Sequence, residues 1–137
     1  MLFRSTNPLV SLPNSNKVEQ ALKKAKFVVV QDISQNSDTV PFADVVFPAA
    51  GWLEKDGTMT NSERRINYLS KVVDAPGETL PDYEIICSVA RKMGYPGFNF
   101  KSAAEVFDEY KQLTKGTSLS IEELNYDYLS KTGTDLP

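Results

Sequence analysis

The sequence predicts an α/β domain of three layers, with a mostly parallel sheet, a β-hairpin excursion and C-terminal helices. Residues 27–30 form a short, uniformly apolar run, which is typical of a strand buried on both faces. A helical pattern stands directly before this run, and helix-capping boxes occur in the last third of the chain. The chain has 137 residues, of which 41% are hydrophobic, so we expect a single domain over residues 1–137.

The first third of the chain predicts a strand, a helix and a second strand. Residues 1–4 are the first strand, and the turn at residues 6–8 ends it. Either Asn14 or Ser15 is expected to cap the helix that follows. Its apolar face consists of Val18, Ala21, Leu22 and Ala25. With residues 27–30 as the next strand, these elements make one βαβ unit, whose crossover should be right-handed.

Two polar residues, Gln31 and Asp32, follow the apolar run directly. In open α/β sheets, ligands bind beyond the carboxyl ends of the strands. A carboxylate at such an edge can accept a hydrogen bond from a ribose diol or a base. From this stretch alone, a nucleotide contact and an ordinary polar turn are equally good interpretations.

The middle of the chain predicts a short strand and a hairpin. Residues 43–48 read as the third strand, which a proline stops. Residues 51–65 are rich in charge around Asp56-Gly57, a dipeptide typical of a hairpin turn. This hairpin is either a charged surface feature or a piece that packs on the core through its apolar residues. Those residues are Trp52, Leu53, Met59 and Ile66.

Helices are predicted for the rest of the chain. Pro81 suits the first turn of one helix, and Gly94 ends it. The apolar stripe of this helix consists of Ile85, Ile86, Val89, Ala90 and Met93. Capping boxes at residues 102–105 and 120–123 begin two more helices. We interpret Cys87 as a small core residue, since the chain offers no base that would activate a thiol.

The composition argues against several functions. A net charge of −3 and a pI near 5.0 give no electrostatic case for nucleic-acid binding. One cysteine and no histidine rule out an iron–sulfur site and the commonest general base. No apolar run approaches the ~18 residues that span a membrane, and residues 1–4 are too short for a signal peptide. We therefore expect a cytoplasmic protein that is better suited to binding than to catalysis alone.

Four stretches together resemble the molybdopterin (bis-molybdopterin guanine dinucleotide) oxidoreductases. They are residues 6–13, 29–32 and 43–50 and the Glu-Lys-x-Gly-Thr-x-Thr-Asn-x-Glu-Arg-Arg block at 54–65. Pro76-Gly77-Glu78 and Pro81-Asp82 continue the series in the same order. Within this family, the opening at 6–13 is most similar to assimilatory nitrate reductase catalytic subunits, and the C-terminal helices also resemble those of formate dehydrogenases.

The resemblance implies a fragment of a longer enzyme, with a Rossmann-like fold that holds the guanosine half of molybdopterin guanine dinucleotide. The molybdenum ligand and the 4Fe–4S cysteines of such enzymes lie in other parts of the parent chain. The resemblance also implies five cofactor-binding residues, namely Asn7, Gln31, Asp32, Lys55 and Asp82. Lys55 would pair with a phosphate, and Asp82 would face the guanine, whose two N–H donors a carboxylate can accept. No catalytic residue and no metal ligand is implied.

Several functions are compatible with this resemblance. The first is a cofactor-binding domain of a molybdenum-dependent nitrate reductase, which converts nitrate to nitrite, with the fragment alone inactive. Alternatives are a formate dehydrogenase fragment and a non-catalytic scaffold domain of an NADH dehydrogenase iron–sulfur subunit. A free-standing nucleotide binder is disfavoured by the lack of a G-x-G-x-x-G or P-loop. The expected partners are the remaining domains of the parent chain and the cofactor, without nucleic acid or membrane, and exposed apolar surface would permit self-association.

Overall fold

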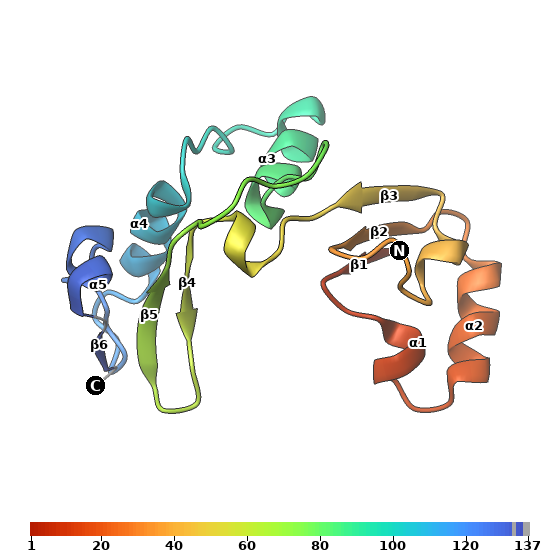
Figure 1. Ribbon diagram of the computed structural model, residues 1–137, viewed down its shortest axis with the longest axis horizontal. Helices are drawn as coiled ribbons and strands as arrows, with labels where there is room; N and C mark the ends of the chain where they lie inside the picture. The colour runs from red at the N-terminus through yellow and green to blue at the C-terminus, as the bar shows by residue number, and fades with distance from the viewer. Residues whose placement is uncertain (133, 136–137) are drawn as a thin grey trace. The chain divides into compact units, whose positions relative to one another are not determined.

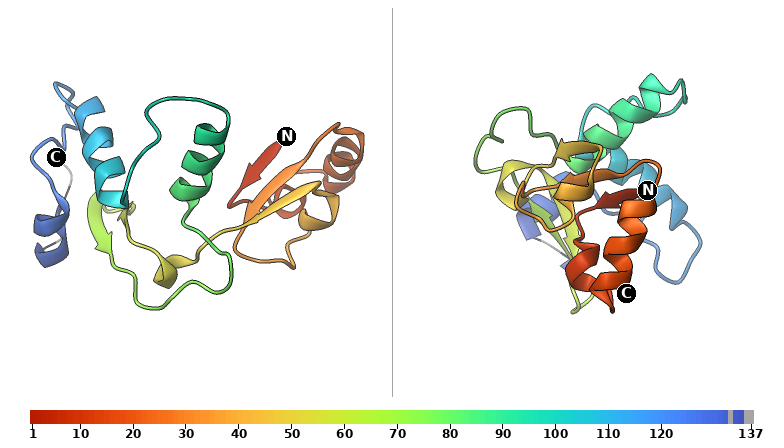
Figure 2. Two further views of the ribbon diagram at one scale, coloured as in Figure 1. Left: turned by 90° about the horizontal axis from the view of Figure 1, so that it is seen from above. Right: turned by 90° about the vertical axis from the view of Figure 1, so that its right-hand side faces the viewer.

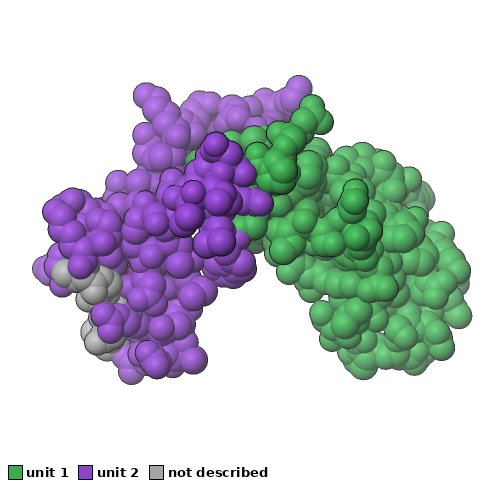
Figure 3. Space-filling model, viewed as in Figure 1, with its two compact units in different colours: residues 1–51, 75–85 green, residues 52–74, 86–137 purple. Residues whose placement is uncertain are grey.

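The computed structural model describes residues 1–132, 134 and 135, and side chains up to residue 131 (Figure 1). The chain divides into two compact units (Figure 3). Unit 1 consists of Met1–Gly51 and Ala75–Ile85, and unit 2 consists of Trp52–Asp74 and Ile86–Pro137. The α/β class is confirmed, with a parallel sheet, a β-hairpin and C-terminal helices. The single domain over residues 1–137 stays a prediction.

Unit 1 is built on a parallel sheet of three strands in the order β1-β2-β3. These strands are β1 (Leu2–Arg4), β2 (Val29–Asp32) and β3 (Val45–Pro48). The register pairs Phe3 with Val30, and Val30 with Val46. The buried strand thus begins two residues later than predicted and includes Gln31 and Asp32. The physical reason is that the pairing with β1 begins at Val29, whose backbone N–H donates to the carbonyl of Met1 at 2.8 Å. Phe27 lies before this pairing and is 53% exposed.

Two helices cover one face of this sheet, α1 (Pro8–Ser11) and α2 (Ser15–Lys24), as the views in Figure 2 show. Their apolar side chains pack with those of β2 around Leu22, Val28 and Val30. Partly buried residues surround this core, namely Phe3, Leu9, Val18, Ala25, Val40, Phe42 and Ala43. Of the two predicted caps, Asn14 holds the helix, because its side chain accepts from the backbone N–H of Lys17.

The segment that returns to unit 1 lies along the end of β3. Ala49 and Leu80 form a parallel bridge. The backbone N–H of Leu80 donates to the carbonyl of Pro48 at 3.2 Å, and the carbonyl of Leu80 accepts from the N–H of Ala50 at 2.9 Å. Helix α3 (Asp82–Lys92) begins directly after this bridge. The short 3-10 helix η1 (Val40–Phe42) precedes β3.

Helix α3 ends where predicted, because Gly94 has a φ of +82° and donates its N–H to the carbonyl of Arg91. Its apolar stripe is buried only in part. Ile85 and Ala90 are buried, whereas Val89 and Met93 are exposed. Cys87 is buried, as predicted for a small core residue.

Unit 2 contains the hairpin of β4 (Gly57–Thr60) and β5 (Arg65–Leu69), and β6 (Thr134–Asp135) pairs with β5. The short 3-10 helix η2 (Trp52–Glu54) precedes β4 in the chain. The predicted turn at Asp56-Gly57 is wrong, since Gly57 begins β4. The chain turns after Asn61, whose side chain accepts from the backbone N–H groups of Glu63 and Arg65. Asp56 instead lies at the open end of the hairpin.

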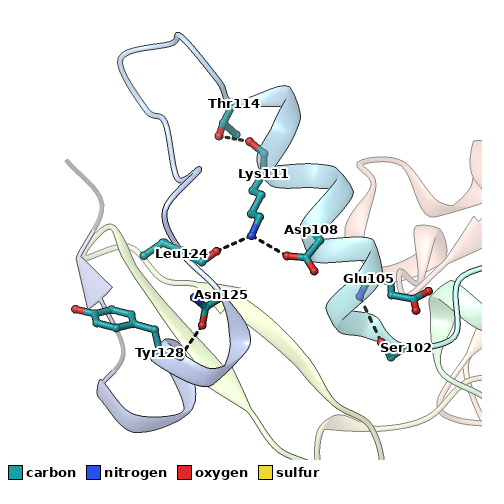
Figure 4. A network of polar contacts seen from close by, with 8 residues as sticks. All are labelled: Ser102, Glu105, Asp108, Lys111, Thr114, Leu124, Asn125 and Tyr128. Carbon is teal, nitrogen blue, oxygen red and sulfur yellow. Dashed lines mark hydrogen bonds and ion pairs between the residues drawn. The ribbon is translucent and has the colours of Figure 1, made fainter.

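Helices α4 (Ala103–Leu113) and α5 (Tyr126–Thr132) complete unit 2. They bury Phe107 and Leu129 against Ile66 and Ile121, with Tyr68, Leu124 and Tyr126 packed around them. Ser102 caps α4 as predicted (Figure 4). The prediction that the box at 120–123 begins a helix is wrong, since α5 begins at Tyr126. Asn125 caps α5 instead, because its side chain accepts from the backbone N–H of Tyr128 at 2.9 Å. None of the helices formed by the described residues combines the length and apolarity needed to cross a bilayer.

Candidate functional site

The candidate site lies at the carboxyl ends of β1 and β2 in unit 1. The side-chain amide of Gln31, in β2, donates through Nε2 to Oδ1 of Asp82 at 2.7 Å. The hydroxyl of Ser5, which follows β1, donates to the same oxygen at 3.2 Å. Three residues that are far apart in the sequence therefore meet at one carboxylate, at the edge where ligands bind in sheets of this kind.

The position of Asp82 follows from the elements on either side of it. The bridge between Ala49 and Leu80 fixes the backbone two residues before it. Asp82 is then the first residue of α3, where the N-terminal end of the helix dipole favours a negative charge. The carbonyl of Pro81 accepts the first N–H bonds of the helix, from Glu84 and Ile85. The carboxylate is thus held by the sheet edge and by the start of a helix.

Ser5 was not predicted as a site residue. It has a left-handed backbone with a φ of +52°, which costs a residue with a side chain about 1 kcal/mol. Its N–H donates to the carbonyl of Gln31 at 3.0 Å, which continues the pairing of β1 with β2. The signal that could have found it is a hydroxyl residue directly after the first predicted strand, at the same sheet edge as Gln31.

Asn7 belongs to a second polar network in unit 1. Its Nδ2 donates to Asp38 at 2.8 Å, and its Oδ1 accepts from the hydroxyl of Thr39 at 2.9 Å. Thr39 is fully buried. The Asn7 amide therefore ties the loop after β2 to the start of α1. The sequence pointed to Asn7 but gave no sign that Thr39 is buried.

The two remaining predicted residues are placed differently. Asp32 is the last residue of β2 and is partly buried. Its Oδ1 accepts from the backbone N–H of Ser34 at 3.1 Å, which shapes the turn beyond the strand. Lys55 lies in unit 2, directly after η2. Among the five predicted residues, Gln31 and Asp82 are joined directly by a hydrogen bond.

The edge of the sheet presents two carboxylates as hydrogen-bond acceptors. Asp32 and Asp82 supply carboxylate oxygens, which accept from N–H and hydroxyl groups. The described residues contain no group of three or more histidine, cysteine or acidic side chains that could hold a metal ion. The carboxylate oxygens are the acceptors that a ligand with N–H or hydroxyl groups would need.

Comparison with known proteins identifies the family. A family model described as molybdopterin oxidoreductase matches residues 1–92 of the 137. This chain belongs to the molybdopterin oxidoreductase family. The resemblance seen in the sequence motifs is confirmed. The matched residues include β1, β2, β3 and all of α3. The residues of the candidate site therefore all lie in the part of the sequence that the family model matches.

Two relatives are similar along most of this molybdopterin oxidoreductase chain. A nitrate reductase from Shewanella frigidimarina is 50% identical over 109 residues, which are 80% of this chain and 12% of the relative. The F420-dependent formate dehydrogenase 2 subunit alpha from Methanococcus maripaludis is 50% identical over 125 residues, which are 90% of this chain and 18% of the relative. The chain thus spans less than a fifth of the length of either relative.

The fold is similar to that of a solved structure, the acetylene hydratase from Pelobacter acetylenicus. The TM-score is 0.73 at 24% sequence identity, and the match covers 98% of this chain and 18% of that one. At this level of identity, the likeness supports the α/β fold.

Proposed function

We propose that this chain binds the guanosine part of a molybdopterin guanine dinucleotide, as one domain of a molybdenum-dependent nitrate reductase. The observation that carries the proposal is the Asp82 carboxylate beside the carboxyl end of β2, 2.7 Å from the Gln31 amide although 51 residues separate the two. This edge of a parallel sheet is where nucleotides bind in α/β folds.

The chemistry of Asp82 suits guanine. The guanine edge offers two adjacent N–H donors, from N1 and N2, and an ionised carboxylate is purely an acceptor. Adenine lacks that pair of donors, so a carboxylate discriminates between the two bases. Asp32, at the end of β2, is proposed to accept from the ribose hydroxyls, and Lys55 to pair with a phosphate. Asn7 is proposed to meet the cofactor in the loop after β1.

In this proposal, the chain binds and orients the cofactor and leaves the chemistry to it. The bound cofactor would supply the molybdenum centre at which nitrate is reduced to nitrite. The molybdenum ligand and the 4Fe–4S cysteines would belong to other domains of a cytoplasmic parent chain, which are also the proposed partners. We therefore expect no nitrate reduction by the 137-residue chain with an artificial electron donor.

The test is the preference of the chain for a guanine nucleotide. GDP and ADP are titrated separately into the isotope-labelled 137-residue chain and followed by NMR, after circular dichroism has established that it is folded. We expect GDP to bind more tightly than ADP, with shifts at residues 31–32 and 82. Asp82→Ala should lose about tenfold or more in GDP affinity and leave ADP unchanged. Glu84→Ala, which removes another acid from the first turn of α3, is the matched control and should keep the preference. Equal affinity for GDP and ADP in the unaltered chain would contradict the proposal.

A formate dehydrogenase is the second candidate for the parent enzyme. The formate dehydrogenase relative matches 125 residues, against 109 for the nitrate reductase relative at the same identity. Both readings share the cofactor and differ in the substrate. Purified full-length parent enzyme, assayed with nitrate and with formate under the same conditions, decides between them. Turnover of formate without turnover of nitrate would contradict the nitrate reductase proposal and would not affect the cofactor proposal.

A further inference from the structure

The side chain of Gln31 is almost completely buried, with 2% of its surface exposed. A side chain this deeply buried has almost no accessible area with which to contact a base. Its amide nitrogen donates a hydrogen bond to Oδ1 of Asp82, a residue of the candidate site. The burial therefore favours an indirect role for Gln31, in place of the direct cofactor contact expected from its position at the strand end.

We propose that Gln31 is a positioning residue that orients the Asp82 carboxylate and thereby sets the base preference of the site, with Ser5 as its assistant. This inference rests on the proposed function, since it takes Asp82 as the group that meets guanine.

The chemistry of the pair fixes how Gln31 is oriented. An ionised carboxylate only accepts hydrogen bonds, so the nitrogen of the Gln31 amide, and not its oxygen, must face Asp82. Burying an amide costs free energy unless it is hydrogen-bonded, so the contact with Asp82 stabilises the folded chain. With Oδ1 tied down, the carboxylate cannot rotate freely about its χ angles. An acceptor that is already oriented loses less entropy when the base binds.

Ser5 adds a second restraint on the same oxygen. Its hydroxyl donates to Asp82 Oδ1 at 3.2 Å, and its backbone N–H donates to the carbonyl of Gln31 at 3.0 Å. The restraint comes from the end of β1, whereas that of Gln31 comes from β2. Donors from two neighbouring strands therefore converge on one carboxylate oxygen. The left-handed backbone of Ser5 is consistent with this arrangement, because it turns the chain at the strand end.

The first variant to make is Gln31→Met, which keeps the length of the side chain and removes the donor. We expect GDP affinity to fall about tenfold and ADP affinity to stay unchanged, measured by the same titrations. Ser5→Ala should lower GDP affinity by about threefold, because its hydrogen bond is longer. Gln20→Met, at an exposed position on α2, is the matched control and should have no effect.

A double-mutant cycle separates positioning from general support of the fold. If Gln31 acts through Asp82, then Gln31→Met should cause no further loss of GDP affinity in an Asp82→Ala background. A role in fold stability alone would give losses that add. The side-chain amide protons of Gln31 provide a readout without any nucleotide: they should exchange slowly with solvent in the unaltered chain and faster in Asp82→Ala.

The outcomes distinguish this inference from the function it rests on. Equal affinity of the unaltered chain for GDP and ADP would overturn the proposed function and, with it, the role of Gln31. A preference for GDP that survives Gln31→Met, or losses that add in the cycle, would overturn the role of Gln31 alone. A preference that is lost in Gln31→Met, with a thermal midpoint close to that of the unaltered chain, supports both.

Discussion

The two units bury different kinds of side chain. Among the described residues, the buried polar side chains are Gln31 and Thr39, and both lie in unit 1. The core cluster of unit 2 consists of Ile66, Phe107, Ile121 and Leu129, with aromatic rings around it. Burying a polar group costs free energy unless it is hydrogen-bonded, so polar burial needs a reason beyond packing. In unit 1, the Gln31 and Thr39 side chains are hydrogen-bonded to Asp82 and Asn7, two residues that the family resemblance implied as site residues.

This contrast separates two properties of the chain. The proposed base preference should depend on the hydrogen bonds of unit 1. The free energy of unfolding should depend strongly on the apolar packing of unit 2. Variants in the two units can therefore break or sharpen the comparison, if nucleotide preference and stability are measured on the same proteins.

The largest effect is expected from Phe107→Ala in unit 2. Phe107 is buried among the core side chains, with its ring centroid 5.6 Å from that of Tyr126. Removing the ring leaves a cavity, and the free energy of unfolding should fall by about 3–5 kcal/mol in urea titrations followed by circular dichroism. Phe107→Leu, which refills most of the space, should lose clearly less. If the fraction of Phe107→Ala that stays folded lost its preference for GDP, the separation between the units would be wrong.

A polar contact of unit 2 gives the next effect. The ammonium of Lys111 donates to the carbonyl of Leu124 at 3.0 Å and pairs with Asp108 at 2.8 Å, which ties α4 to the chain before α5 (Figure 4). Its side chain is only 16% exposed. Lys111→Met should lower the free energy of unfolding by about 2 kcal/mol, because the carbonyl and the carboxylate lose a charged partner.

The control for Lys111→Met is Lys115→Met. Lys115 pairs with Glu122 at 2.7 Å, but its side chain is 66% exposed. Exposed ion pairs contribute little, so no measurable change in unfolding is expected. Equal losses in the two variants would mean that burial does not decide the strength of these contacts.

Thr39→Val tests a buried polar group of unit 1 that does not touch Asp82. The substitution keeps the shape of the side chain and removes the hydroxyl that donates to Asn7. We expect a loss of about 1 kcal/mol in the free energy of unfolding, since the amide oxygen of Asn7 loses its buried donor. The ratio of GDP to ADP affinity should stay the same. Thr6→Val, at an exposed position, serves as the control, and a changed ratio in Thr39→Val would extend the preference to Asn7.

Local patterns predicted much of the fold but little of the site. The strands of unit 1, the cap of α2 and the end of α3 follow from periodicity and from turn residues within a few positions of each other. The hairpin turn was misplaced because Asp56-Gly57 is a turn signal, whereas Asn61 closes the turn with its side chain. A short-range signal cannot tell which of two candidate turns the rest of the hairpin will use.

The site itself depends on pairing over long distances in the sequence. Asp82 meets Ser5 and Gln31 across 77 and 51 residues, and no periodic pattern records such pairs. The strand-end rule pointed to Gln31 and Asp32, at the edge of the sheet where Asp82 also lies, and family resemblance alone pointed to Asp82. Ser5 and Thr39 were missed because their roles come from backbone conformation and burial, which only the folded chain defines.

A small loss of stability is also expected at alkaline pH, and it belongs to unit 2. Burial raises the pKa of Tyr126 to about 12, and Tyr68 and Asp56 add to the shift. Burial, followed by Asp56, whose carboxylate accepts from its hydroxyl at 3.2 Å, also raises the pKa of Tyr68. The folded state thus favours the neutral phenols. The resulting stability is fully present below the ordinary tyrosine pKa of about 10 and is lost as the pH rises toward about 12.

After a discount for the solvent that screens the half-buried Tyr126 ring, the loss should reach about 1 kcal/mol. Urea unfolding at about pH 8 and about pH 11 measures it, and tyrosinate absorbance follows the ionisation directly. Tyr126→Phe removes the ionisable group and keeps the ring contacts with Tyr68 and Phe107, so most of the alkaline loss should disappear. An unchanged loss in Tyr126→Phe would assign the alkaline sensitivity to other groups.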